Sequence, residues 1–271
     1  MLRKRLRPAM KRITSRHNPI VARIRAVARG ETADLLLLDG IHLVLEGMAA
    51  GLPIRQAAIA ADAADRADVQ DVLTRLSRLH VDVVAVGASV MTALSPVRSS
   101  SPVVAVADRP RTDAGRVYRA TPFAVIAVDV QDPGNLGAIV RVAEAGGATG
   151  VVVAGASADP FGWKALRGSM GSALRLPFVS QKDGASAIDE ARRHRCRIVA
   201  MVPRDGRSLF DIHLAGPVAV LIGGEGQGLT PSLLDAADER VTIPMQAPVE
   251  SLNAAVTAAL VVYEARRQRQ R

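Results

Sequence analysis

The chain has 271 residues, 49% of them hydrophobic, so it can bury a sizeable core and is not a disordered polypeptide. Its longest stretch without a charged residue, 83–97, spans 15 positions, which is short of the roughly 18 that a membrane helix needs, so we expect no membrane span. The single cysteine excludes a disulfide framework and a four-cysteine zinc site, and the five histidines lack metal-ligand spacing, so we expect no metal.

The net charge of +9 is concentrated at the two ends of the chain. Residues 1–30 carry ten Lys or Arg and no acid, residues 266–271 carry four Arg, and the region between holds 21 basic against 26 acidic residues. Such ends neutralise phosphates, so we interpret both as basic arms, the first over residues 1–17, and expect a nucleic acid as partner. A solvated tail and an Arg-rich transit peptide are the alternatives. Because no secretory signal is visible, we expect a cytoplasmic protein.

Residues 18–108 are predicted to form a small α/β domain. Asn18 and Pro19 mark the start of a helix whose apolar positions repeat at helical spacing. The other expected elements are strands over 35–38, 54–60, 81–86 and 103–107 and helices over 41–50 and 64–79. Residues 109–122 are polar, with a proline near each end, and are predicted to be a linker.

Residues 123–271 alternate between Val- and Ile-rich strands and helices, which predicts a mostly parallel sheet covered on both faces. The expected strands cover 123–130, 151–154, 178–179, 197–202, 218–222 and 241–244. The expected helices cover 136–145, 163–174, 185–194, 231–237 and 252–266. Ligands of open α/β sheets bind beyond the carboxyl ends of the strands, so the loops at these ends are candidate sites.

The first candidate loop, residues 131–137, leads into a helix that Asn135 could cap. Arg141 follows within an otherwise apolar turn, where an arginine is costly to bury unless it meets an anion. The alternative is a plain helix cap with a structural arginine that pairs with Glu144 or another acid.

The second candidate loop, residues 223–228, has four glycines in six positions, which lets a backbone approach a ligand closely. The dinucleotide-binding spacing fails because Leu229 stands where a third glycine is needed, and no phosphate-binding Gly-Lys-Ser/Thr occurs. An NAD-dependent oxidoreductase is therefore disfavoured. Glu225, alone among the glycines, is predicted to lie close to a ligand; a flexible turn with a solvated acid is the alternative.

The third candidate loop, residues 243–253, opens the last helix, and Ser251 is a good N-cap for it. A helix N-terminus favours a carboxylate or a phosphate. From their residues alone, the three loops predict a nucleotide-like ligand at the strand ends.

Three motifs lie in these loops, in order, over about 120 residues. They are N-x-G-x-x-x-R (Asn135, Gly137, Arg141), G-x-E-x-x-G (Gly223, Glu225, Gly228) and I-P-M-x-x-x-x-x-S-L-N (Ile243 to Asn253). The chain thereby resembles the SpoU (TrmH-like) branch of the SPOUT methyltransferases, which transfer methyl from S-adenosylmethionine to a ribose 2′-hydroxyl of rRNA or tRNA. Residues 14–107 also resemble, less specifically, the substrate-binding domain of the rRNA-modifying members.

The resemblance implies an α/β SPOUT-type trefoil-knot catalytic domain over 123–271, a small N-terminal α/β domain that binds RNA over 18–108, and a homodimer. It implies a cofactor site at Gly223, Gly224, Gly228, Ile243, Met245 and Leu252. It implies a catalytic group of Asn135, Arg141, Glu225, Ser251 and Asn253. Two departures are visible: Ala247 and Asp39 stand where the family usually has Gly and Glu, which bear on cofactor affinity and on RNA recognition respectively.

The implied reaction is an in-line displacement, in which positioning supplies much of the rate. Arg141 is a poor base because the guanidinium pKa is about 12 or higher. We expect it to hold a substrate phosphate and to stabilise alkoxide charge, while Glu225 or Asn135 orients the hydroxyl.

Two other functions stay open at this point. One is methylation of a pyrimidine carbon by Cys196, whose thiol pKa the flanking arginines could depress. The other is a non-catalytic RNA-binding assembly factor on the same fold. The extra N-terminal domain favours rRNA over tRNA as the substrate.

Overall fold

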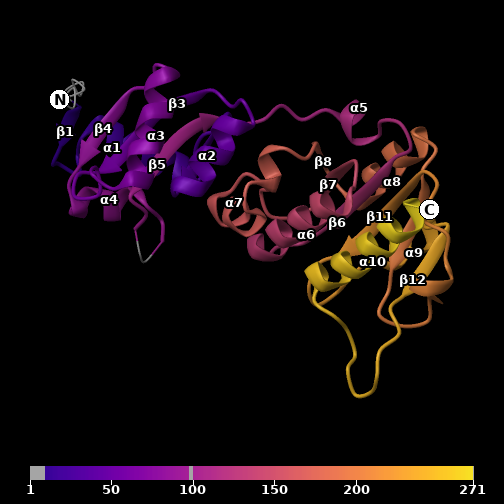
Figure 1. The fold of residues 1–271 in the computed structure, drawn as a ribbon. Coiled ribbons are helices and arrows are strands. Elements are labelled where there is room, and N and C mark those ends of the chain that lie inside the picture. Colours follow the sequence, from indigo (N-terminus) through magenta and orange to yellow (C-terminus); the bar gives the residue numbers. More distant parts are fainter. Residues whose placement is uncertain (1–9, 98–99, 271) are drawn as a thin grey trace. The chain divides into compact units, whose positions relative to one another are not determined.

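The computed structural model of the protein describes residues 10–97 and 100–270. The chain forms two compact units that divide between Pro110 and Arg111 (Figure 1). Each unit has its own sheet. Within the described ranges, no helix is both long enough and apolar enough to cross a membrane.

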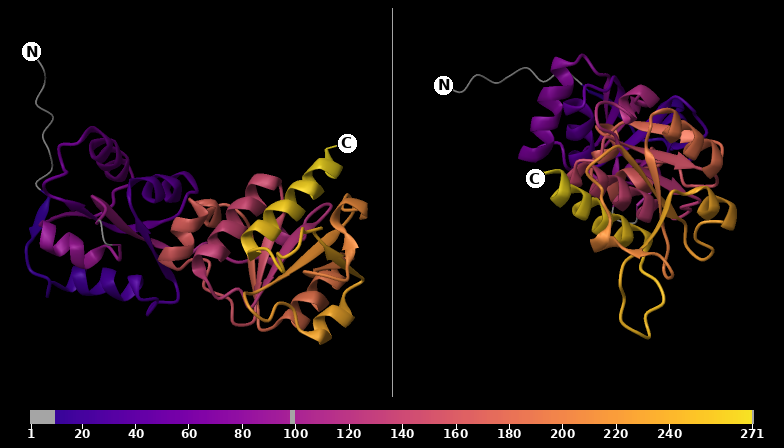
Figure 2. Two further views of the ribbon diagram at one scale, coloured as in Figure 1. Left: turned by 90° about the horizontal axis from the view of Figure 1, so that it is seen from below. Right: turned by 90° about the vertical axis from the view of Figure 1, so that its right-hand side faces the viewer.

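The first unit is a five-stranded sheet with two helices on each face. Its strands are, in spatial order, β1 (Lys11–Ile13), β4 (Val83–Val86), β3 (Ile54–Ala60), β5 (Val103–Asp108) and β2 (Leu35–Asp39). Strand β5 is antiparallel to both of its neighbours, and the other pairs are parallel. The helices are α1 (Pro19–Ala28), α2 (Ile41–Ala49), α3 (Ala67–Arg78) and α4 (Ala88–Leu94). Helix α1 packs with α4 on one face, and α2 packs with α3 on the other (Figure 2).

Local sequence signals explain much of this unit. The Asn18 side chain accepts a hydrogen bond from the Ile20 N–H and caps α1 as expected, and Val21, Ile24 and Val27 bury one face of that helix. The sequence missed α4, and it missed β1, which lies within the expected basic arm. Strand β1 has three residues and joins the sheet edge by pairing with β4, a partner that only the tertiary structure supplies. Residues 1–9 of the arm lie outside the described residues.

The second unit contains a seven-stranded sheet, and all of its strand pairs are parallel, which confirms the predicted sheet type. Its strands are, in spatial order, β10 (Arg207–Ser208), β12 (Glu239–Thr242), β9 (Arg197–Met201), β11 (Val218–Gly223), β6 (Phe123–Val128), β7 (Gly150–Ala154) and β8 (Phe178–Gln181). Every residue of the central strand β6 is buried, as expected for a sheet covered on both faces.

Helices cover both faces of the second sheet. They are α5 (Ala114–Val117), α6 (Pro133–Gly146), α7 (Trp163–Ser169), α8 (Gly184–Arg193), α9 (Pro231–Ala236) and α10 (Ala254–Arg269), with short 3₁₀ turns at Ser172–Leu174 and Leu209–Asp211. Helix α6 packs against α7 and α10, whereas α8 and α9 pack on the other face of the sheet (Figure 2). The threading of the last helix through a loop stays a prediction.

Two glycines permit the close packing of α6. A Cβ atom at Gly137 would lie 2.5 Å from the Ala165 carbonyl oxygen of α7, and one at Gly146 would lie 2.0 Å from a methyl of Val262 on α10. Gly137 belongs to the first motif. The absence of a side chain at this position lets α6 and α7 pack closely, so the motif glycine has a structural role.

Three expectations for this unit were wrong in detail. The expected linker, 109–122, contains α5, whose Val117 is fully buried. The expected helix over 163–174 breaks after Ser169, because Met170 adopts a left-handed conformation. The C-terminal arginines do not form an arm up to residue 270: they end α10, and Arg269 donates 2.8 and 3.2 Å hydrogen bonds to the Leu214 and Pro122 carbonyls.

We predict that Gly137→Ala lowers the free energy of unfolding by about 1–3 kcal/mol, because the new methyl would overlap the α7 backbone. Gly216→Ala, in the same unit with open space at the Cβ position, is the matched control. Urea denaturation measures both. Equal stabilities of the two variants would contradict the packing argument.

Candidate active site

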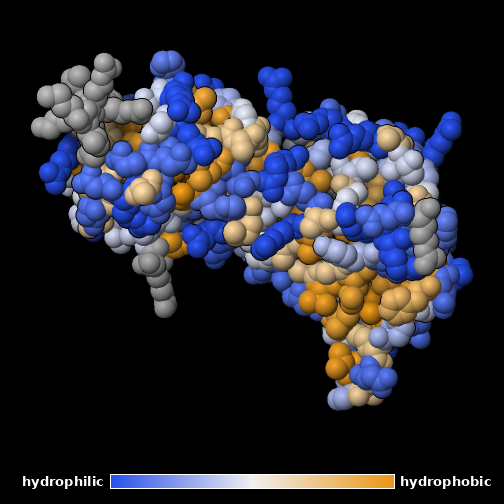
Figure 3. All heavy atoms as spheres, viewed as in Figure 1, coloured by the Kyte–Doolittle hydropathy of each residue, from blue (hydrophilic) through white to orange (hydrophobic). Residues whose placement is uncertain are grey.

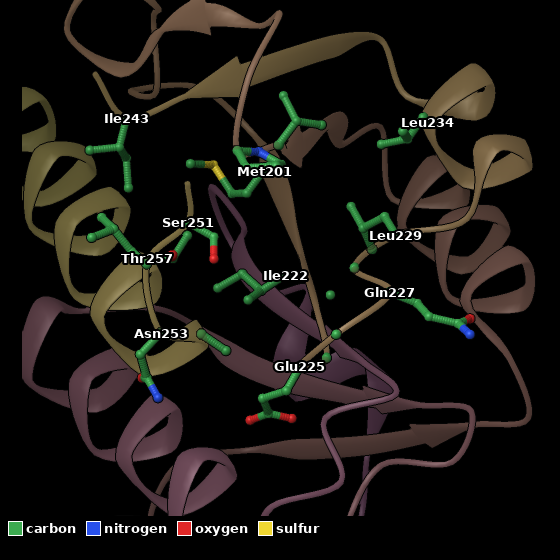
Figure 4. Close-up of a pocket in the computed structure, with 18 of the residues that line it drawn as sticks. Met201, Ile222, Glu225, Gln227, Leu229, Leu234, Ile243, Ser251, Asn253 and Thr257 are labelled. Atoms are coloured by element: carbon green, nitrogen blue, oxygen red, sulfur yellow. The ribbon is translucent and has the colours of Figure 1, made fainter. Parts of the chain in front are cut away.

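A cavity of about 520 Å³ opens at the carboxyl ends of the second sheet (Figure 4). Three chain segments supply most of its lining: the end of β9 with the residues that follow, the loop after β11, and the connection from β12 into α10; Leu234 of α9 adds to them. Its size lies within the range of small-molecule sites. The cavity is therefore where a ligand of the parallel sheet is expected.

All six residues predicted to bind a cofactor lie in the wall of this cavity, and their contact with a cofactor stays a prediction. They are Gly223, Gly224, Gly228, Ile243, Met245 and Leu252. Further lining residues lie outside the predicted site, among them Met201, Val202, Pro203, Leu229, Leu234 and Thr257. Met201 ends β9 and Val202 and Pro203 follow it, and the strand-end rule applied to this strand could have found them.

The glycines of residues 223–228 let this loop pack closely against the rest of the chain. The sequence pattern predicted close approach to a ligand, not this packing role. A Cβ atom at Gly224 would lie 1.9 Å from the Asp129 carbonyl oxygen, and one at Gly223 would lie 2.5 Å from the Gly228 carbonyl carbon. Gly226 and Gly228 have positive φ angles of 92° and 65°, which other residues adopt with strain. These constraints turn the loop back and leave Glu225 exposed at its tip.

Three predicted catalytic residues meet through side-chain hydrogen bonds. The amide nitrogen of Asn135 donates to a carboxylate oxygen of Glu225, and the Asn253 amide donates to Asn135 Oδ1 over 3.0 Å. These residues come from three separate loops, 90 and 118 positions apart in sequence. Glu225 and Asn253 lie at the same end of the cavity in Figure 4. The exposed Ser251 also lines the cavity.

The helix caps predicted at Asn135 and Ser251 were both wrong, and the observed caps explain the geometry of the site. Asp132 caps α6 by accepting a 2.7 Å hydrogen bond from the Asn135 N–H. Asn253, not Ser251, caps α10, and its Oδ1 accepts from the Ala255 N–H at 2.8 Å. Because Asp132 performs the capping, the Asn135 side chain is available to Glu225 and Asn253.

Arg141 does not join this group. It is exposed, it does not line the cavity, and it has no hydrogen-bond or ion-pair partner within the part of the chain that the structure describes. The six-residue step from Asn135 corresponds to about 240° around the helix axis, so the two side chains leave α6 in different directions. The alternative that Arg141 pairs with Glu144 or another acid was wrong: Glu144 pairs with Arg175 at 2.8 Å, and Arg141 has no acidic partner among the described residues.

The structure also tests the cysteine alternative. Cys196 is 4% exposed, and burial raises the pKa of its thiol to about 11, the opposite of the predicted depression by neighbouring arginines. It lies in the core cluster with Tyr118 and Ile198, away from the cavity lining. A nucleophilic role for Cys196 is thus contradicted. Across the described residues, no group of three or more His, Cys, Asp or Glu side chains is arranged to hold a metal ion.

The parallel sheet and the largely apolar cavity with polar groups at its strand ends are typical of α/β proteins that bind a nucleotide-like ligand. Comparison with known proteins is more specific: residues 122–263 match the model of the SpoU rRNA Methylase family. The chain belongs to that family, a family of S-adenosylmethionine-dependent methyltransferases.

Individual relatives support this assignment. An uncharacterized tRNA/rRNA methyltransferase of Synechocystis is 31% identical over 263 residues, which cover 94% of this chain and 93% of that protein. A 23S rRNA uridine 2′-O-methyltransferase of Streptomyces viridochromogenes is 35% identical over 70% of this chain and 69% of its own length. The solved SpoU methyltransferase AviRb of that organism, with AdoMet bound, superposes with a TM-score of 0.84 at 28% identity, covering 94% of this chain and 99% of the other.

We predict that the Cys196 thiol does not react with Ellman's reagent in the native protein at pH 8. A thiol with a pKa of about 11 stays protonated there, and burial blocks access to it. The same protein in guanidinium chloride should release one equivalent of chromophore. Rapid labelling of the native protein would contradict this environment.

Proposed function

We propose that this protein transfers a methyl group from S-adenosylmethionine to a ribose 2′-hydroxyl of 23S-type ribosomal RNA. The supporting observation is the hydrogen-bonded group Glu225–Asn135–Asn253 at the edge of the glycine-lined cavity. The 23S rRNA relatives favour this substrate over tRNA. We propose the cytoplasm as the location because the substrate is ribosomal RNA.

The cavity has the chemistry that this cofactor requires. Ile222, Leu229 and Leu252 offer apolar surface for a flat base, and Glu225 offers a carboxylate to a cationic sulfonium. The exposed backbone of the glycine loop offers polar groups at close range. When bound, S-adenosylmethionine supplies an electrophilic methyl group.

The residues of the chain then position the second reactant. We propose that Asn135 holds the Glu225 carboxylate in place and that the two orient the ribose hydroxyl, with Ser251 close by on the cavity wall. Asn253 fixes Asn135 from the other side and ties it to the start of α10. Arg141 would bind a phosphate of the substrate and stabilise the negative charge that develops on the ribose oxygen.

The position of Arg141 supports a homodimer. Arg141 does not line the cavity of its own chain, so we propose that it acts at the site of a second copy. Val256, Leu260 and Tyr263 form an apolar stripe at helical spacing on α10, with 46, 40 and 52% of each residue exposed. An apolar patch is visible over α10 in Figure 3. Such a stripe fits burial against a second copy.

The charges of the first unit support its proposed role in RNA binding. Lys11, Arg12, Arg23 and Arg25, here called the basic layer, are exposed on β1 and α1, and none forms an ion pair with an acid of the described chain. Helix α4, which packs with α1, contains no charged residue. On the opposite face, Arg66 and Arg75 pair with Asp68 and Asp71. Arg23 and Arg25 are exposed without an acidic partner on α1, so we propose that RNA phosphates bind on the face of α1 and α4 and at the adjoining edge strand β1.

The proposed reaction can be tested with unmodified ribosomal RNA and labelled cofactor. We predict one new 2′-O-methyl position, and Asn253→Asp should lower its rate of formation by about tenfold or more, since an aspartate cannot donate to Asn135. Aspartate caps a helix as well as asparagine, so unfolding free energy should change by less than about 0.5 kcal/mol. Cofactor binding by calorimetry without methylation of any RNA would instead favour the scaffold function.

Neutralising the basic layer should weaken RNA binding. We predict that changing Arg12, Arg23 and Arg25 together to Gln lowers the affinity for RNA about tenfold. The slope of log affinity against log salt concentration should become shallower by roughly 2–3, and the affinity for the cofactor should not change. Arg66, Arg75 and Arg78 changed together to Gln form the matched control on α3. If the control weakens RNA binding equally, the assigned face is wrong.

Mixing two inactive variants tests the homodimer. Arg141→Ala and Glu225→Ala should each abolish methyl transfer and leave the chain folded. After subunit exchange, the mixture should recover about a quarter of wild-type activity, because half of the dimers are mixed and each has one complete site. No recovery, with mixed dimers shown by mass spectrometry, would contradict the use of Arg141 across the interface.

A further inference from the structure

Asp129 lies directly after the central strand β6 and has a backbone conformation that is rare outside glycine. Its φ angle is +55°, in the left-handed region, which Asp and Asn tolerate better than most residues. The chain thus turns sharply at the end of the strand. Neither the motifs nor the loop compositions pointed to this residue.

The Asp129 side chain binds the loop that follows the neighbouring strand β7. Its Oδ1 accepts a 2.7 Å hydrogen bond from the Ala156 N–H, and the Asp129 N–H donates to the Ala154 carbonyl over 3.1 Å. The carboxylate lies so close to Gly155 that a Cβ there would be 2.3 Å from Oδ1. This side chain therefore helps to join the β6 and β7 loops, beside the hydrogen bonds that Val130 makes with Ser157 and Ala158.

The main chain of Val128 and Asp129 contacts the loop on the other side, after β11. The Gly224 N–H donates to the Val128 carbonyl over 2.8 Å, and a Cβ at Gly224 would lie 1.9 Å from the Asp129 carbonyl oxygen. Glu225 is the next residue. Asp129 thus contacts the loops of both strands that flank β6 in the sheet.

The two chain segments that carry Asn135 and Glu225 are both in contact with the turn at Asp129. Glu225 follows the glycine that packs on the Asp129 carbonyl, and Asn135 lies six residues after Asp129 on a path fixed at Val130 and Asp132. Val130 N–H donates to Ser157 Oγ over 3.0 Å, and Asp132 caps α6. A change in the turn at Asp129 would therefore move one partner relative to the other.

We propose that Asp129 is a positioning residue for the proposed methyl transfer: its left-handed turn and its carboxylate set the contact between Asn135 and Glu225. This proposal rests on the proposed function, but only its kinetic test depends on that function. The carboxylate contributes by holding the β7 loop, and it does not itself touch a substrate.

Two variants distinguish the effect of the carboxylate from the effect of the left-handed turn. Asp129→Gly keeps the left-handed conformation and removes the carboxylate, whereas Asp129→Asn keeps both the conformation and a hydrogen-bond acceptor. Asp183→Gly is the matched control, because Asp183 accepts a hydrogen bond of the same 2.7 Å length from the Ser186 N–H after strand β8.

We expect Asp129→Gly to lower kcat by about tenfold or more while the KM values for RNA and cofactor stay within about threefold. Asp129→Asn and Asp183→Gly should keep kcat near that of the wild type. A purely structural role would lower the unfolding midpoint of Asp129→Gly and leave kcat unchanged, which would overturn the proposal. Loss of kcat in Asp129→Asn to the same extent as in Asp129→Gly would also overturn it.

A crystal structure of Asp129→Gly gives a readout that does not depend on activity. The proposal requires that the Asn135 amide and the Glu225 carboxylate separate beyond 3.5 Å in the variant, and an unchanged contact would overturn it. A wild-type protein that methylates no RNA would refute the proposed function, and the crystal structure would still decide the positioning role.

Discussion

The hydrogen bonds from Asn135 to Glu225 and from Asn253 to Asn135 bring together three loops that are far apart in the chain. Each loop follows a different strand of a parallel sheet, and the carboxyl ends of those strands meet at one edge. An amide suits the central position because it both donates and accepts. Asn135 donates to a carboxylate on one side and accepts from a second amide on the other. A carboxylate or an amine at position 135 could satisfy only one of these partners.

The backbone around the site has little freedom to change. Gly224 packs on the Asp129 carbonyl, Gly137 packs on α7, and Gly146 packs on Val262 of α10. A side chain at any of these positions would displace the helix or the loop that carries a residue of the hydrogen-bonded group. These glycines thus serve packing within the protein, in addition to any contact with a ligand.

The sequence was sufficient to predict most strands of the second unit, because each is a short Val- and Ile-rich run between helices. It could not decide the helix caps. Asp132 lies three residues before Asn135, and Ser251 lies two residues before Asn253, and a propensity does not distinguish between neighbouring cap formers. Arg141 is exposed because α7 and α10 cover other parts of α6. The apolar residues beside Arg141 in the sequence do not indicate which face of the helix stays uncovered.

The site itself was predicted in part. The motifs located the cavity wall and the members of the hydrogen-bonded group, because these residues are polar or glycine at strand ends. The residues after β9 and the turn at Asp129 were missed, since Met201, Val202 and Pro203 resemble ordinary core and turn residues. Their role is visible only when strand β9 is placed beside β11.

A crystal structure of the protein with S-adenosylmethionine and a short RNA tests the account most directly. We expect the cofactor in the cavity between the glycine loop and the start of α10, with a ribose 2′-hydroxyl within hydrogen-bond distance of Asn135 or Glu225. A cofactor bound elsewhere, or a ribose that approaches the methyl group from a side without these residues, would contradict it.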